Sequence, residues 1–200
     1  MDLNELFYKV SYLVLWILYV LIRVPHDQRY KQLVKKQRIT SAGERIFVVL
    51  GFIGLLILPL VWVLTPWLDG FVLQEPQWLR LLGIVLAIVS LWYFWKVHAA
   101  LGLNWSPTLE IRAEHQLVTT GLYKRIRHPM YLQIWMWVIA CTLIISNSVV
   151  ATGSIGALAI MYIIRVRREE RMMIEAFGGR YVLYKTETGR IFPKLFKKDH

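Results

Sequence analysis

Two short charged segments contain the residues of this chain whose types and spacing could do chemistry. The first runs from Arg127 through His128, Pro129 and Met130 to Tyr131, directly before an apolar stretch. Proline favours the first position of a helix, because its missing N–H group has no partner there. A helix start offers free N–H groups and the positive end of the helix dipole, which suit a carboxylate or phosphate. A basic loop at a membrane edge would have the same composition, so the segment alone does not establish a site.

The second segment contains Arg165, Glu169 and Glu170, where the last apolar stretch ends. Arg165 and Glu169 are four residues apart, so on a helix they share one face and can reach the same ligand. Ionisable side chains at membrane level are costly and are therefore candidates for function. A basic anchor with ion pairs along its own helix explains this segment equally well.

The composition indicates a membrane protein. Of the 200 residues 56% are hydrophobic, nine are Trp, and the mean hydropathy is +0.45. Five apolar stretches approach or reach the roughly 20 residues that a helix needs to cross a bilayer. They cover residues 6–22, 46–64, 79–97, 130–145 and 149–164. We therefore predict an all-α, polytopic membrane protein with five transmembrane helices in a single domain, residues 1–200.

The net charge of +11 lies between the apolar stretches, which favours a membrane surface over nucleic acid as its partner. Residues 23–45 carry seven Lys and Arg, residues 96–129 carry five and residues 165–200 carry ten, and only Lys9 and Arg80 lie elsewhere. Cytoplasmic loops of membrane proteins are enriched in Lys and Arg. The pattern predicts an N-terminus outside, a cytoplasmic C-terminus and membrane lipids as surroundings. We expect neither nucleic acid nor a metal as a partner.

The spacing of the last two stretches predicts where the two charged segments meet. Only residues 146–148 separate these stretches, so the helices should form a tight antiparallel hairpin. Its cytoplasmic ends would bring residues 128–131 beside residues 165–169. Residues 98–128 mix turn residues with apolar patches and predict a folded cytoplasmic loop at the same place. Residues 165–177 predict an amphipathic helix that ends at the Gly178-Gly179 pair and completes a ligand pocket.

The ordered set of these residues resembles the isoprenylcysteine carboxyl methyltransferase family, and more narrowly its short prokaryotic members with five spans. The resemblance covers residues 98–195. It rests on residues 115–123, on Arg127 to Tyr131, on Arg165 with Glu169-Glu170, and on the closing residues 177–193. It implies an integral membrane enzyme that uses S-adenosylmethionine as methyl donor.

The resemblance also implies roles for single residues. It assigns the binding of S-adenosylmethionine to ten of them: His115, Gln116, Leu117, Val118, Tyr123, His128, Pro129, Met130, Tyr131 and Glu169. Arg165 takes the place of the family's substrate-facing arginine, so Arg165 and Glu169 are the predicted catalytic residues. The implied acceptor is the carboxylate of a C-terminal isoprenylcysteine, or a similar lipophilic carboxylate, that enters from the bilayer.

Methyl transfer from a sulfonium to a carboxylate needs no general base, because the nucleophile is already ionised, and positioning and desolvation carry the reaction. Three alternatives stay open. A phospholipid amine or a thiol could be the acceptor, and an amine would need a proton acceptor such as His128 or His115. A reductase is the second alternative, because membrane sterol reductases carry a similar C-terminal cytoplasmic pocket for a nicotinamide cofactor, although they are usually much longer. A non-catalytic membrane protein is the third.

Overall fold

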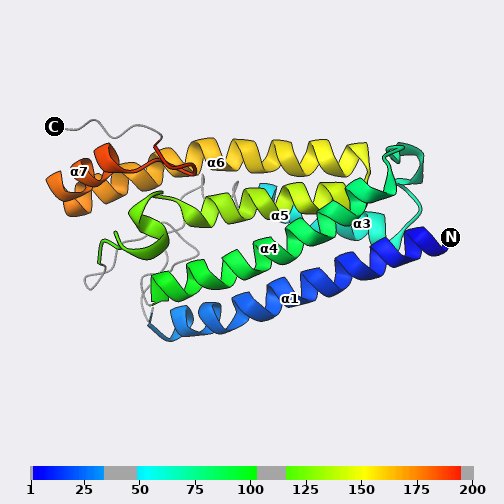
Figure 1. The fold of residues 1–200 in the computed structure, drawn as a ribbon, viewed down its shortest axis with the longest axis horizontal. Helices are drawn as coiled ribbons and strands as arrows, with labels where there is room; N and C mark the ends of the chain where they lie inside the picture. The colour runs from blue at the N-terminus through cyan, green and yellow to red at the C-terminus, as the bar shows by residue number, and fades with distance from the viewer. Residues whose placement is uncertain (1, 34–48, 103–115, 195–200) are drawn as a thin grey trace.

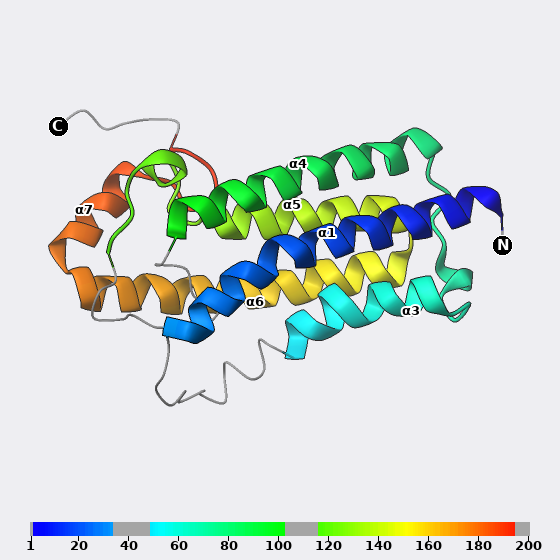
Figure 2. The same cartoon turned by 90° about the horizontal axis from the view of Figure 1, so that it is seen from below.

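The computed structural model describes residues 2–33, 49–102 and 116–194. In these ranges the chain is helical, and extended pairing is limited to two isolated bridges. Four long helices lie side by side along one axis (Figure 1 and Figure 2): α1 (Leu3–Leu33), α4 (Gln77–Leu101), α5 (Pro129–Ile145) and α6 (Ser148–Phe177). The N-terminus and the short helix α7 (Gly179–Glu187) lie at opposite ends of this bundle. The predicted all-α class is therefore confirmed.

Among the residues that the structure describes, three helices are long and apolar enough to cross a membrane: Leu3–Gln28 within α1, all of α4 and all of α6. Two shorter apolar helices, Val49–Leu64 and Pro129–Ile145, accompany them. Many large apolar side chains of α1 and α4 are exposed, among them Val14, Leu21 and Val85. Outward-facing apolar side chains of this kind suit a hydrocarbon solvent. The chain is thus a membrane protein with three candidate spans, and the count of five remains a prediction.

The predicted hairpin of α5 and α6 is present (Figure 1). Ser146 adopts the left-handed conformation with φ of 51°, which ends α5 and turns the chain. The side chain of Asn147 then caps α6, accepting from the N–H groups of Val149 and Val150 at 3.1 and 3.2 Å. Asparagine is a favoured capping residue because its oxygen satisfies N–H groups that have no partner within the helix. This short turn aligns the two helices along their length.

Close packing and one ion pair fix the other helices of the bundle. The helix at residues 49–64 contains a π-helical turn, η1 (Ile53–Ile57), followed by α3 (Leu58–Leu64). In η1, Gly54 lies against α6, where the Ser154 hydroxyl donates to its carbonyl oxygen at 2.5 Å. At the N-terminal end, buried Arg80 of α4 binds Glu5 of α1 at 2.9 Å and the carbonyl of Ile144 at 2.9 Å. The open end of the α5–α6 hairpin, which carries the two charged segments, lies at the opposite end of the bundle.

Candidate active site

The predicted meeting of the two charged segments is observed at the end of the hairpin. His128 precedes α5 and faces two consecutive carboxylates of α6. Its Nδ1 lies 3.5 Å from Oε1 of Glu169, and its Nε2 lies 3.4 Å from Oε1 of Glu170. One turn into α5, the hydroxyl of Tyr131 donates to Oε2 of Glu169 at 2.9 Å. A histidine thus bridges two carboxylates, and a tyrosine fixes one of them.

The two carboxylates determine the charge of His128, whose side chain is buried. Burial by itself lowers the pKa of a histidine, because it penalises the charged form. Here the hydrogen bonds to Glu169 and Glu170 outweigh burial and raise the pKa of His128 above its usual value. With a carboxylate beside each ring nitrogen, the protonated form can donate on both sides. The raised pKa therefore favours a positive charge between the two carboxylates.

Glu170 is the centre of a wider network. Arg127 reaches its Oε1 through Nη2 at 3.2 Å, and Arg190 reaches Oε2 through Nη2 at 3.2 Å. Lys185 of α7 lies 3.5 Å from the same carboxylate. The Glu170 side chain is only 5% exposed, whereas that of Glu169 is 29% exposed. Glu169 is therefore partly accessible, while Glu170 is enclosed by protein.

The segment after α7 lies against the residues that precede α5. The N–H of Arg127 donates to the carbonyl of Gly189 at 2.8 Å, and the N–H of His128 donates to that of Arg190 at 2.9 Å. A Cβ atom at Gly189 would lie 1.7 Å from the carbonyl oxygen of Phe192, so only glycine fits there. The chain end at residues 188–190 thereby orients the backbone of His128.

Helix α7 also supports the loop before α5 from its buried face. Tyr184 donates its hydroxyl to the carbonyl of Tyr123 at 2.6 Å, within the 3-10 turn η4 (Gly121–Lys124). Burial raises the pKa of Tyr184 to about 12, so the hydroxyl keeps its proton and remains a donor. Figure 1 and Figure 2 show α7 beside this loop. The loop, α7 and the hairpin end thus form one unit.

The structure gathers most of the predicted site residues. Tyr123, His128, Pro129 and Tyr131 are buried, Met130 is half-buried, and half-buried Arg165 interacts electrostatically with both Tyr131 and Glu169. Gln116 is exposed and Leu117 and Val118 are half-buried in the irregular segment that leads into η4. His115 lies outside the described residues, as do residues 103–114 of the predicted cytoplasmic loop.

The start of α5 is a weaker anion site than the sequence predicts. Pro129 has no N–H, and the N–H groups of Tyr131 and Leu132 already donate to the carbonyl of His128, at 3.1 and 3.2 Å. Fewer N–H groups therefore remain for a ligand than a helix start usually offers. The partly exposed carboxylate of Glu169 is therefore a better candidate for ligand binding than the helix start.

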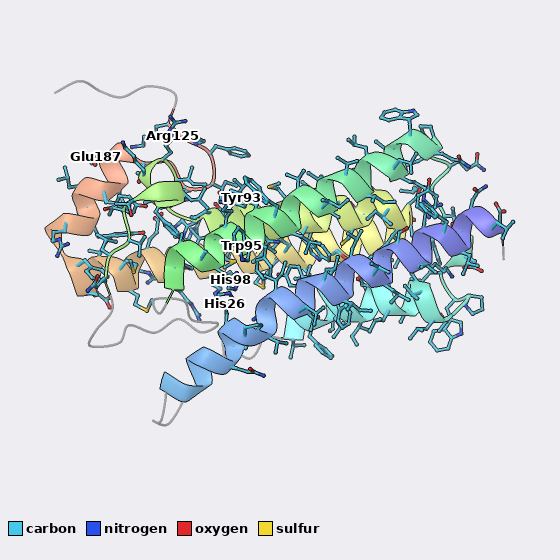
Figure 3. The ribbon with its side chains drawn as sticks, turned by 60° about the horizontal axis from the view of Figure 1, so that its bottom comes forward. His26, Tyr93, Trp95, His98, Arg125 and Glu187 are labelled. Carbon is cyan, nitrogen blue, oxygen red and sulfur yellow. The ribbon has the colours of Figure 1, made fainter. Side chains whose placement is uncertain are left out.

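Sequence reasoning assigned no role to several residues around the site. Glu170, Lys185 and Gly189 each hold a site element in place, as described above. Tyr93 of α4 interacts electrostatically with Tyr123, and Figure 3 shows it on the same helix as His98, whose ring lies 4.4 Å from that of His26. For Glu170 the available signal was its position next to Glu169 where the last apolar stretch ends, since ionisable groups at membrane level are candidates for function.

The sequence around this site is similar to a known protein family and to several curated proteins. Residues 81–175 match the sequence model of the isoprenylcysteine carboxyl methyltransferase family. The chain is 36% identical over 77 residues to protein-S-isoprenylcysteine O-methyltransferase of Saccharomyces cerevisiae, covering 38% of this chain and 32% of that protein. It is 28% identical over 131 residues to the Xenopus laevis enzyme of the same name, covering 64% and 46%. The chain thus spans between a third and a half of the length of these curated relatives.

A solved structure shares the fold. The eukaryotic intramembrane Ras methyltransferase, isoprenylcysteine carboxyl methyltransferase, superposes with a TM-score of 0.57 at 22% identity, covering 78% of this chain and 54% of the other. The region matched by the family, residues 81–175, includes the His128, Tyr131, Arg165 and Glu169 cluster. The resemblance that the sequence suggests is thus confirmed: residues 81–175 are similar to the isoprenylcysteine carboxyl methyltransferase family.

Proposed function

We propose that this chain is a membrane-embedded methyltransferase that uses S-adenosylmethionine to methylate the carboxylate of an isoprenylcysteine or of a similar lipophilic acid. The observation that carries the proposal is the carboxylate of Glu169, held by Tyr131 at 2.9 Å and by His128 at 3.5 Å within the region that matches the family. The cofactor supplies an electrophilic methyl group on a sulfonium. The residues of the chain bind and orient the cofactor and the acceptor, and they exclude water from both.

The site suits the cofactor's charges. Glu169 keeps 29% of its side chain exposed, so it can accept from the cofactor's ammonium group. The rings of Tyr131 and Tyr162 lie edge to face, 5.5 Å apart, on the two helices that meet there. Aromatic faces attract cations such as a sulfonium. Residues 98–195 are the proposed cofactor-binding part, with Gln116 to Val118 and His115 on its entry loop.

Arg165 is the proposed ligand of the acceptor carboxylate. It lies one turn before Glu169 on α6 and interacts electrostatically with Tyr131 and Glu169. A guanidinium group presents a planar fork of donors that matches a carboxylate. Ester formation removes one negative and one positive charge, so a water-poor membrane edge favours the reaction. Arg165 would therefore position the acceptor next to the sulfonium without changing its charge.

The contacts of His128 favour a carboxylate over an amine as the acceptor. An amine attacks as its free base and needs a group that removes a proton. His128, the described histidine of the site, has its ring nitrogens 3.4 and 3.5 Å from carboxylates, and these carboxylates raise its pKa and favour the imidazolium. An imidazolium held in this way has no lone pair for a proton. A carboxylate nucleophile is already ionised and needs none.

The proposal includes an arrangement in the membrane. The chain forms one methyltransferase domain with spans at about residues 6–22, 46–64, 79–97, 130–145 and 149–164. Its Lys and Arg residues favour an outside N-terminus and a cytoplasmic site. The acceptor would then come from the bilayer and the cofactor from the cytosol.

Membranes that contain the protein test the acceptor directly. They are incubated with S-adenosylmethionine labelled on its methyl group and with either a farnesylated cysteine analogue or phosphatidylethanolamine. We expect a base-labile methyl ester on the cysteine analogue, made by the wild type and by Glu175→Gln, an exposed control on α6, but not by Glu169→Gln. Label found only in phospholipid would show that the acceptor is an amine and not a carboxylate.

A further inference from the structure

Glu170 connects three separate parts of the chain through one buried carboxylate. Arg127 and His128 contact it from the segment before α5, Lys185 from α7 and Arg190 from the chain end, all at 3.2 to 3.5 Å. Four cationic groups thus converge on a side chain that is 5% exposed. Opposite charges at these distances in a buried place attract each other more strongly than they would in water.

The position of His128 links this network to the proposed cofactor site. Its Nε2 lies against Glu170 and its Nδ1 against Glu169. The ring donates to both carboxylates at once only while it carries both protons; a neutral ring donates through one nitrogen and turns the lone pair of the other toward a carboxylate. The charge of Glu170 favours that doubly protonated form, so Glu170 affects Glu169 through His128 without touching it.

We propose that Glu170 is a positioning residue that keeps His128 a doubly protonated donor, so that His128 orients the carboxylate of Glu169 for the cofactor's ammonium. This inference rests on the proposed function and assigns a role to a residue that contacts neither cofactor nor acceptor. Arg127 and Arg190 balance the charge of Glu170. Through these contacts they also attach the chain end to the start of α5.

The groups that act on His128 come from every element around it. Glu169, Glu170 and Arg165 lie on α6, and Tyr131 on α5 has its ring centre 5.6 Å from that of His128. Arg127 is its neighbour in sequence. Lys185 and Arg190 lie beyond Glu170 on α7 and the chain end. The two carboxylates stabilise the imidazolium and the four cations oppose it, so removal of one group changes the pKa of His128 in a direction that its charge dictates.

The test measures the pKa of His128 by NMR in the purified full-length protein, whose five histidines permit assignment with His128→Gln. Glu170→Gln should lower this pKa by about one unit or more relative to wild type. Glu175→Gln, on the exposed side of the same helix, should leave it unchanged. In the same variants, affinity for S-adenosylmethionine should fall about tenfold in Glu170→Gln near neutral pH and recover as pH is lowered. The KM for cofactor should rise more than kcat falls.

A second variant covers a failure of Glu170→Gln to fold. Arg190 has 50% of its side chain exposed, so its replacement is tolerated more readily. Arg190→Gln removes an opposing positive charge and should raise the pKa of His128, the reverse of the effect of Glu170→Gln. A role limited to stability gives no such reversal of sign.

The inference is overturned if the pKa of His128 stays the same in Glu170→Gln and Arg190→Gln, or if it shifts in the same direction in both. It is also overturned if the cofactor affinity of Glu170→Gln is lowered and acidic pH does not restore it. If the wild type binds no S-adenosylmethionine but the pKa of His128 shifts as expected, the proposed function fails and the link from Glu170 to His128 stands.

Discussion

At the residue scale, the adjacent carboxylates of Glu169 and Glu170 differ in what surrounds them. Glu170 is enclosed by cations from three segments, whereas Glu169 contacts His128 and Tyr131 and keeps 29% of its side chain exposed. The helix directs them to different partners, because consecutive residues of a helix point about 100° apart. One carboxylate therefore organises the site, and the other remains accessible to a ligand.

His128 makes the stability of the protein depend on pH. Its pKa is raised in the folded state, so its contribution is fully present below the usual histidine value of about 6.5 and is lost as pH rises through the higher folded pKa. We expect the thermal midpoint in detergent to fall over that range in wild type. In His128→Gln this part of the dependence should be absent. A pH profile that is the same in both proteins would contradict the charged bridge.

Arg165 and Glu169 should separate binding from turnover. Arg165→Ala removes the proposed ligand of the acceptor, so we expect kcat for the acceptor to fall by a factor of about 100 while cofactor affinity changes little. Arg171→Ala, an exposed arginine on the same helix, is the control and should match wild type. Loss of cofactor binding in Arg165→Ala with normal turnover at saturation would reverse the assignment.

At the element scale, α4 and α5 pack through a glycine. A Cβ atom at Gly83 would lie 2.8 Å from the Cβ of Leu143 and 2.9 Å from the carbonyl oxygen of Ala140. Small residues allow helices in membranes to approach closely and gain dispersion contacts. This contact orients α5, whose end carries His128. The geometry of the site therefore depends on packing far along the helix.

Gly83→Ala should destabilise the protein by about 1–3 kcal/mol, because the added methyl group meets backbone and Cβ atoms that cannot move independently. Gly156→Ala on α6 is a matched control, since a Cβ atom there meets nothing within 4 Å. That control should be neutral or slightly stabilising, because alanine favours a helix by about 1 kcal/mol over glycine. Thermal unfolding in one detergent compares the two. Equal midpoints would show that α4 and α5 are not closely packed at this place.

At the scale of the whole molecule, the N-terminus and α7 lie at opposite ends of the helical bundle (Figure 2). Net charge follows the same division, since only Lys9 and Arg80 among the 24 basic residues lie near the outer side of the proposed spans. The distribution of Lys and Arg therefore predicts that α7 lies on the cytoplasmic side and the N-terminus outside, and the long helices are long enough to connect the two sides.

Cysteine labelling tests that arrangement in a chain with one native cysteine, Cys141, which is buried. In a Cys141→Ala background, an impermeant maleimide should label Asp2→Cys from outside and Glu187→Cys only after the membrane is opened. Both positions are exposed. Labelling of both from the same side would overturn the orientation.

The sequence was sufficient for contacts that local rules determine. Residues 146–148 are too few for anything but a hairpin, and the hairpin brings His128 to Glu169. The network of Glu170 was not predictable in the same way. Arg190 follows it by 20 residues, beyond α7, and its contact depends on how α7 turns back at Gly178, where φ is 54°. Charged surface residues have many possible partners, and only tertiary structure selects among them.

Binding of S-adenosylmethionine to the purified protein in detergent tests the central claim most directly. Isothermal titration should show one site in wild type and in Glu175→Gln, and loss of binding by a factor of about 100 or more in Glu169→Gln, because that variant removes the charge opposite the cofactor's ammonium. All three proteins should have similar circular dichroism. Absence of binding in folded wild type, or unchanged affinity in Glu169→Gln, would contradict the account.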